Sequence, residues 1–103
     1  MKMLVRGYRT ALGEVDLICR DGDRVVFVEV KTRRWGNPAE AVDANKQRRL
    51  ALAALHFLKR HRLLETAARF DVVAITWRGA GEPELVEHFP NAFEPPGRWQ
   101  MFS

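Results

Sequence analysis

Four residues on one short stretch of the sequence carry side chains that could bind a cation and assist hydrolysis. With the two-residue period of a β-strand, Glu14 and Asp16 share one face of the first half of this stretch. Glu29 and Lys31 share one face of its second half. Carboxylates at this spacing, followed by a lysine two residues after the last acid, favour a metal-assisted reaction on an anionic substrate.

The turn sequence Asp21-Gly22-Asp23 separates the two halves and predicts an antiparallel hairpin. A four-residue loop would place Asp16 opposite Glu29 and Glu14 opposite Lys31. A two-residue loop would place Glu14 opposite Glu29 instead. Both registers keep the carboxylates on one face, whereas a register of opposite parity would separate them.

Carboxylates gathered on half-apolar strands repel one another and lose hydration, so stability alone does not explain them. Mg²⁺ or Mn²⁺ would relieve the repulsion, because these ions take oxygen ligands, are commonly held by one or two carboxylates, and keep bound waters. Lys31 would then lie beside the scissile phosphate. The alternative is a solvated sheet face with a Glu14–Lys31 ion pair, which would contribute little.

Composition and length predict one domain that spans residues 1–103. The 103-residue chain is 47% hydrophobic, which is enough for a single core. Its net charge is +4, and the positive charge is concentrated in residues 1–62, which hold 14 Lys and Arg against 7 Asp and Glu. This distribution favours a polyanionic partner such as DNA, and a basic surface without a partner is the alternative.

No apolar run approaches the roughly eighteen residues that span a membrane, and the first residues lack the apolar centre of a signal peptide. We therefore expect a cytoplasmic protein that does not bind a membrane. Cys19 is the only cysteine, which excludes an internal disulfide. Alternation predicts that Val15, Leu17 and Cys19 face away from the carboxylates.

The remaining elements follow from periodicity and from turn residues. Met3 to Arg9 is expected to be the first strand. Pro38 to Val42 can form a short helical turn, and Asp43 is the predicted N-cap of a helix from Ala44 to about His61. The apolar stripe that would pack this helix on a sheet consists of Leu50, Ala54, Phe57 and Leu58.

The C-terminal third predicts two more strands and a tail. Arg69 to Trp77 is typical of a buried strand, in which Asp71 is expected to be a hydrogen-bonded structural residue. Glu84 to Phe89 can return as an edge strand. The tail, Pro90 to Ser103, could pack over the core or take part in a dimer contact.

Two basic clusters are candidates for nucleic-acid contacts. The first combines guanidinium groups with an aromatic ring that could stack on a base, although its tryptophan could equally cover the core edge. The second places positive charge in the opening turns of the helix, where it opposes the helix dipole. Gln47 is a further candidate for a nucleic-acid contact in this cluster, and it could also reach the metal site or its water. The two clusters are Arg33, Arg34 and Trp35, and Lys46, Arg48 and Arg49.

Five sequence blocks occur in order along the chain: GEVDLI, VFVEVKTR, PAEAVDANKQRRL, RFDVVAIT and EHFPNAF. Together they resemble the YraN family of small bacterial proteins, which is similar to the archaeal Holliday junction resolvases and belongs with the PD-(D/E)XK nucleases. The resemblance covers Tyr8 to Glu94. It implies an α/β fold with a restriction-endonuclease-like core, in which helices flank a mixed central sheet. It also implies a Mg²⁺-dependent phosphodiesterase site and often a homodimer.

The resemblance assigns roles to individual residues. Asp16 corresponds to the metal-binding aspartate, Glu29 to the second acid and Lys31 to the lysine, and the Val30 carbonyl would assist in holding the metal. Glu14 would be a further ligand or a base that orders water. Relatives usually begin with an additional helix that carries a glutamate near the site, whereas this sequence starts almost at its first strand.

These observations lead to a metal-dependent endonuclease that acts on DNA, in particular on branched or structured DNA, as the first hypothesis. A non-catalytic nucleic-acid-binding module on the same scaffold is the second. A nuclease that processes RNA is the third. No residue in the sequence can be assigned to recognition of a 2′-hydroxyl or of a base sequence, so the sequence does not distinguish RNA from DNA.

Overall fold

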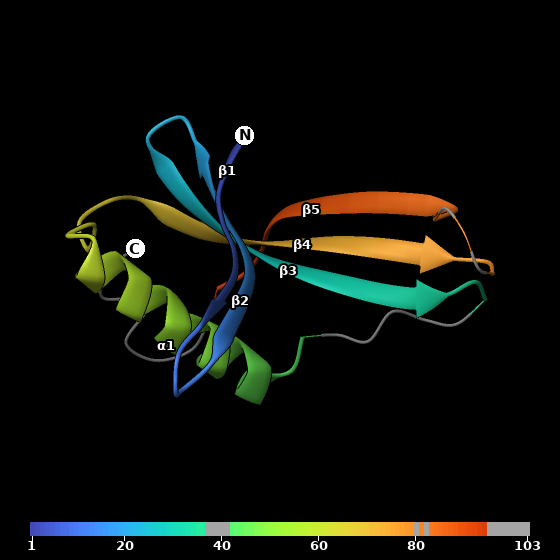
Figure 1. Cartoon of the computed structure of the whole chain (residues 1–103), viewed down its shortest axis with the longest axis horizontal. Helices are drawn as coiled ribbons and strands as arrows, with labels where there is room; N and C mark the ends of the chain where they lie inside the picture. The colour runs from blue at the N-terminus through green and yellow to red at the C-terminus, as the bar shows by residue number, and fades with distance from the viewer. Residues whose placement is uncertain (37–41, 80, 82, 95–103) are drawn as a thin grey trace.

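The computed structural model describes residues 1–36, 42–79, 81 and 83–94. The described part contains five strands and one helix (Figure 1). In chain order these are β1 (Lys2–Arg9), β2 (Glu14–Asp21), β3 (Arg24–Arg34), α1 (Ala44–Arg60), β4 (Ala68–Trp77) and β5 (Leu85–Phe93).

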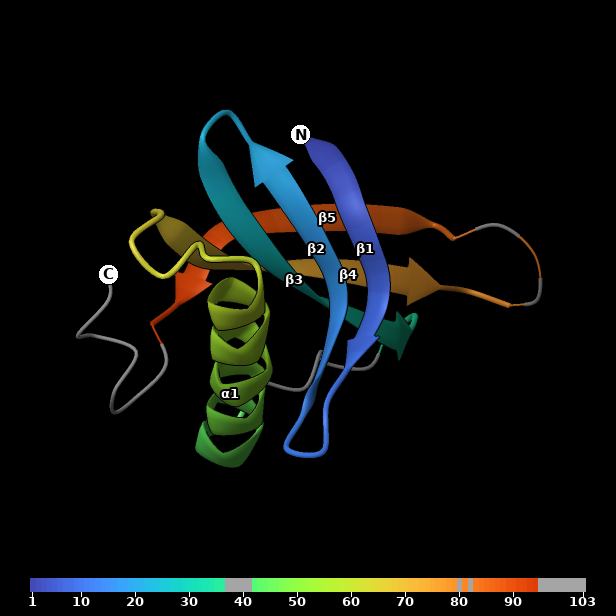
Figure 2. The same cartoon turned by 60° about the vertical axis from the view of Figure 1, so that its left-hand side comes forward.

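The strands form one mixed sheet in the order β1-β2-β3-β4-β5. Neighbouring strands are antiparallel except β3 and β4, which are parallel and are connected through α1. The helix lies on one face of the sheet, and β3, β4 and β5 continue beyond it as a twisted arm (Figures 1 and 2). The predicted α/β class, with a hairpin, one long helix and a mixed sheet, is confirmed.

The register of the hairpin between β2 and β3 decides whether Asp16 and Glu29 lie opposite each other. Arg20 pairs with Val25, which is the register of the longer predicted loop. Asp21 and Arg24 also pair, so only Gly22 and Asp23 form the turn, and Gly22 has a φ of +63° that suits glycine. This register puts Asp16 at the level of Glu29.

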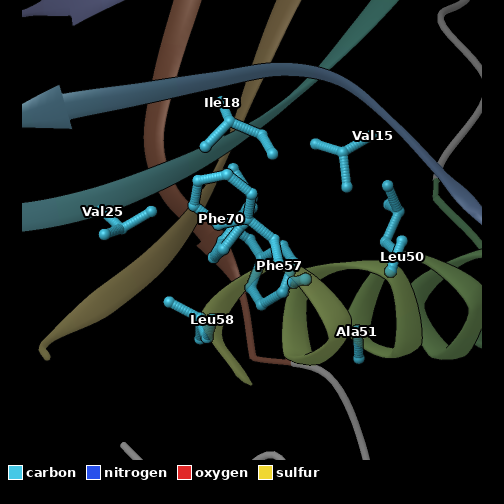
Figure 3. Packing of buried hydrophobic residues seen from close by; sticks show 11 residues of the cluster. Val15, Ile18, Val25, Leu50, Ala51, Phe57, Leu58 and Phe70 are labelled. Carbon is cyan, nitrogen blue, oxygen red and sulfur yellow. The ribbon is translucent and has the colours of Figure 1, made fainter. Parts of the chain in front are cut away.

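The helix begins where its sequence predicts. The Asp43 side chain accepts a hydrogen bond from the Lys46 N–H at 2.8 Å, which caps the first turn. The predicted apolar stripe is buried against the sheet (Figure 3). Phe57 anchors the contact, because its ring packs edge-on against the rings of Tyr8 and Phe27.

One predicted facing is wrong. Val15 is fully buried in the same cluster as Ile18, and both side chains point toward α1 (Figure 3). Leu17 and Cys19 pack in a second cluster with Val26 on the opposite face, as predicted. Strict alternation fails between Val15 and Ile18, at the point where the ladder between β2 and β3 ends.

The last strand is longer than the sequence suggested. β5 continues through Pro90 to Phe93, residues that we expected in the tail. A proline is tolerated because β5 is an edge strand, and the pairing shifts register between Phe70 and Val72. Asn91 adopts a positive φ of 50° there, and Phe93 stacks on Phe70. The rest of the tail, residues 95–103, and the predicted turn at residues 38–41 lie outside the described residues.

Within the described residues, no helix combines the length and the apolar character needed to cross a membrane.

Candidate metal and nucleic-acid site

Asp16 and Glu29 lie close together on the face of the sheet that carries α1. The Asp16 Oδ2 atom accepts a hydrogen bond of 2.7 Å from the backbone N–H of Val30, the residue next to Glu29. Glu29 alternates in phase with Val25 and Phe27 of the helix-side core, and is only 5% exposed. Its pKa is raised, first by burial and also by the nearby charge of Asp16. The predicted proximity of the two carboxylates is therefore observed.

Lys46, from the first turn of α1, forms an ion pair with the Glu29 carboxylate. The hydrogen bond to Glu29 raises the pKa of Lys46, which keeps the ammonium charged. The same bond opposes the rise in the pKa of Glu29 without cancelling it. One lysine thus faces two acids, and negative charge remains at the site.

Sequence reasoning did not pair Lys46 with Glu29. The available signal was a positive charge in a helix's first turn, where it opposes the dipole. This charge predicts a DNA contact, whereas the structure pairs it with the buried Glu29 carboxylate.

Lys31 and Gln47 lie on the other side of the acids, toward β4. Lys31 follows Glu29 by two residues on the same face of β3 and is half-buried. It forms no ion pair within the part of the chain that the structure describes. Gln47 donates from Nε2 to the Val42 carbonyl at 2.9 Å. Both residues line a cleft of about 640 Å³.

Glu14 does not lie opposite Lys31 in a strand ladder. The ladder between β2 and β3 ends at Leu17, and Glu14 pairs with Arg9 of β1 instead. Their side chains form an exposed ion pair at 3.5 Å. A second cleft of about 450 Å³ opens beside Glu14, and Arg9, Lys46 and Arg49 line it. This is the more basic of the two clefts that flank the acids.

The turn between β1 and β2, beside this second cleft, contacts the backbone of α1. Gly13 lies against the Arg49 carbonyl so tightly that an added Cβ would overlap the oxygen atom. The turn between β1 and β2 therefore packs directly on the start of α1. This contact links the strand that carries Asp16 to the helix that carries Lys46.

The residues present fit a magnesium-type ion. Among the described residues, no group of three or more His, Cys, Asp or Glu side chains converges, so a closed cage of zinc type is absent from that part of the chain. Mg²⁺ needs fewer protein ligands, because it is commonly held by one or two carboxylates and keeps several waters. A residue's N–H and C=O point to the same neighbouring strand, so the Val30 carbonyl is directed toward β2 as its N–H is.

The predicted basic cluster at the end of β3 has two different environments. Arg33 is held within the sheet by Thr76 at 2.8 Å and Glu87 at 3.3 Å. Trp35 is 54% exposed, and its ring lies 4.4 Å from the Arg78 guanidinium. Arg34 is exposed beside them. The tip of the arm therefore presents an aromatic ring with two cations.

The three cations of the predicted cluster on α1 also have different environments. Arg48 is exposed and hydrogen-bonds Asn45 at 3.0 Å, and Arg49 lines the basic cleft. Lys46 points to Glu29. Contact of these residues with DNA stays a prediction, and the position of Arg49 in the cleft beside Glu14 and Lys46 suits a phosphate contact.

Comparison with known proteins places the chain in a family. Residues 1–75 match the model of the uncharacterised protein family UPF0102. A UPF0102 protein of Anaeromyxobacter dehalogenans is 52% identical over 100 residues, which cover 94% of this chain and 73% of the relative. UPF0102 proteins of Geobacter metallireducens and Rhodococcus opacus are each 48% identical over 96 residues, which cover 90% of this chain and 77% and 80% of the relatives. The chain therefore belongs to the uncharacterised protein family UPF0102, the YraN family that its sequence blocks resemble.

Proposed function

We propose that this protein is a metal-dependent endonuclease that hydrolyses phosphodiester bonds in branched or structured DNA. The observation that carries the proposal is the pair of acids on one face of the sheet, Asp16 and Glu29, with the Val30 backbone beside them. An acid on one strand followed by Glu-X-Lys on its neighbour is the arrangement that the resemblance to the PD-(D/E)XK nucleases implies.

Asp16, Glu29 and the Val30 carbonyl would hold Mg²⁺ or Mn²⁺. The ion, when bound, would supply a Lewis acid for the phosphoryl oxygen and lower the pKa of water. Lys31, which has no ion pair among the described residues, would offset the negative charge that develops on the phosphoryl oxygens. The low exposure of Glu29 would keep this part of the site dry and strengthen these interactions.

The distribution of cations supports a polyanionic substrate. Arg9 and Arg49 line the cleft on one side of the acids, and Arg34 and Arg78 lie at the tip of the arm. Groups at both places could contact phosphates several nucleotides apart on one nucleic-acid chain. The exposed ring of Trp35 could stack on a base.

A specific observation favours a second function, a non-catalytic nucleic-acid-binding module. The ion pair between Lys46 and Glu29 supplies a cation to the acids without any metal. If Lys46 is the permanent counter-ion, the protein would bind nucleic acid through its basic surfaces and leave it intact.

A cleavage assay with matched variants separates the two functions. We expect Asp16→Asn and Lys31→Ala each to reduce Mg²⁺-dependent nicking by at least about a hundredfold, while DNA affinity changes by less than about threefold. Asparagine can still accept the Val30 N–H, so the fold should survive. The control is Asp21→Asn, an exposed acid on the same strand, which should cut as the wild type does.

The substrates should be duplex DNA, a four-way junction, single-stranded DNA and structured RNA, each with Mn²⁺ and with Mg²⁺. Faster cutting of the junction would support the proposal, and faster cutting of RNA would replace it with RNA processing. Cutting by Asp16→Asn or Lys31→Ala at the wild-type rate would contradict the assigned roles. Salt-sensitive DNA binding without any metal binding would establish the non-catalytic module.

A further inference from the structure

The cleft on the β4 side of the acids has the size and the walls of a small-ligand site. Its volume of about 640 Å³ lies in the range typical of such sites. Val72, Phe89 and Phe93 give it apolar walls, and its polar lining residues are Lys31, Gln47 and His88. Apolar walls with a few polar groups are the usual composition of a ligand pocket.

This cleft adjoins the candidate metal site. Lys31 belongs to both, since it lines the cleft and follows Glu29 by two residues, a distance of about 7 Å along the strand. A phosphate held between the acids and Lys31 would therefore leave its own nucleotide at the mouth of the cleft. The occupant that this position favours is a part of the same substrate.

The walls suit a flat ring that also forms hydrogen bonds. Phe89 is 46% exposed, so its ring offers a surface for stacking. The Gln47 side chain carries both a donor and an acceptor, and of these only Nε2 has a partner among the described residues, the Val42 carbonyl. A nucleobase has two stackable faces and polar edges, which match these groups.

We propose that this cleft binds one unpaired nucleobase next to the phosphate held at the acids. The proposal rests on the proposed function for the presence of a polynucleotide, and it deepens that function by naming the feature that selects the substrate. A base inside an intact duplex must be flipped out before it can enter such a pocket, which costs energy. Gaps, bulges and junction points offer unpaired bases without that cost.

The charge around the cleft favours this occupant over a second copy of the chain. Lys31 lines it, and Arg9 and Arg49 line the basic cleft on the other side of the acids. A second basic copy would bring further positive charge to this place, whereas a nucleotide brings negative charge.

The test is binding without divalent metal, so that cleavage plays no part. The probes are a fluorescein-labelled DNA duplex and the same duplex with a three-nucleotide bulge that contains 2-aminopurine, both in EDTA. Wild-type protein should prefer the bulged duplex by about tenfold and change the 2-aminopurine emission. Phe89→Ala should remove most of this preference. Val86→Ala, which truncates an exposed apolar residue on the same edge strand outside the cleft, should retain it.

A second variant fills the cleft instead of emptying it. Ala92 is exposed and lines the cleft, so Ala92→Phe should block the base while leaving the core intact. Circular dichroism melting confirms that each variant is folded. Equal affinity of the wild type for both duplexes, or an unchanged preference in both Phe89→Ala and Ala92→Phe, would overturn the proposal. Association of the protein with itself that Ala92→Phe abolishes would also overturn it, in favour of a second copy.

The outcome is independent of hydrolysis. Preference for the bulge without any cleavage in Mn²⁺ would preserve the base pocket and remove the nuclease. Metal-dependent cleavage that ignores unpaired bases would preserve the nuclease and remove the base pocket.

Discussion

Glu29 and Asp71 are both acids buried on central strands of the same sheet, yet their surroundings differ. Asp71 on β4 is fully buried and accepts hydrogen bonds from Arg69, from His88 at 2.7 Å and from the Asn91 N–H at 2.9 Å. Burial alone would raise its pKa, but these partners outweigh it and hold the pKa of Asp71 below its usual value.

Glu29 on β3 has the opposite balance. Its ion-pair partner is Lys46, a lysine that is itself half-exposed, and another acid, Asp16, lies nearby. Burial dominates, so the pKa of Glu29 is raised. An acid whose hydrogen-bonding capacity is used within the fold is structural, as we predicted for Asp71. An acid with one ion-pair partner beside a second acid is the one that we propose binds a cation.

The largest expected effect comes from replacing Asp71, the acid whose pKa its partners hold low. Asp71→Asn leaves Arg69 and His88 without their buried charge partner and should lower the free energy of unfolding by about 3–5 kcal/mol. Urea denaturation at pH 7 measures this loss. The control is Asp21→Asn, which removes the exposed second partner of Arg69 and should cost less than about 1 kcal/mol. Similar small losses from both variants would contradict a structural role for Asp71.

The same variant should change the dependence of stability on pH. The pKa of Asp71 is lower in the folded protein than in the unfolded chain, where it is about 3.9. Its stabilisation is therefore complete above that value and is lost as the pH falls through the folded pKa. Below pH 4 the stability of Asp71→Asn should fall less steeply than that of the wild type, as melting at a series of pH values would show.

The next effect tests how the site around Glu29 is assembled. Gly13→Ala places a Cβ on the Arg49 carbonyl and should destabilise the protein by about 1–3 kcal/mol, because the turn and α1 must separate. Gly79→Ala is the control, since a Cβ there meets open space, and it should be neutral or slightly stabilising. Equal melting temperatures for the two variants would show that the turn does not pack on the helix as described.

A substitution of Lys46 tests whether its ammonium competes with a metal ion for Glu29. Lys46→Met removes the ammonium that a divalent cation must displace from Glu29, so Mn²⁺ should bind about tenfold more tightly. Isothermal titration measures the affinity. Arg48→Met, on the same turns of the helix but hydrogen-bonded to Asn45, should change it little. Weaker Mn²⁺ binding in Lys46→Met would mean that the lysine supports the site instead of competing for it.

The smallest effect is expected for Glu29→Gln, the substitution that corresponds to Asp71→Asn. Glu29→Gln should change the free energy of unfolding by less than about 1 kcal/mol, because burial disfavours the charge that is removed. Urea denaturation alongside Asp71→Asn gives the comparison directly. A loss as large as that of Asp71→Asn would place Glu29 among the structural acids.

The sequence predicted the features that depend on local periodicity. The hairpin register was one of two predicted alternatives, the Asp43 cap was predicted, and the apolar stripe of α1 was identified from spacing alone. Together these bring the chain at Asp16 to the level of Glu29. Alternation and turn chemistry suffice for this because the period of a strand decides which side chains share a face.

The features that the sequence did not predict depend on tertiary contacts. The pairing of Lys46 with Glu29 requires knowing where the start of α1 lies on the sheet. Val15 faces α1 because alternation breaks beside Asp16. The contact of Gly13 with Arg49 joins backbone segments that are far apart in the sequence. Both predicted partners of Glu14, Lys31 and Glu29, require the ladder to extend to it, and the ladder ends before it. Each of these depends on the docking of one element on another.

The central claim is that Asp16 and Glu29 together hold one divalent cation. Titration of the wild-type protein with Mn²⁺ in a calorimeter tests it most directly. We predict one Mn²⁺ per chain in the wild type and in Asp21→Asn, and loss of binding in both Asp16→Asn and Glu29→Gln. Absence of Mn²⁺ binding in the wild type, or undiminished binding in those two variants, would contradict the claim.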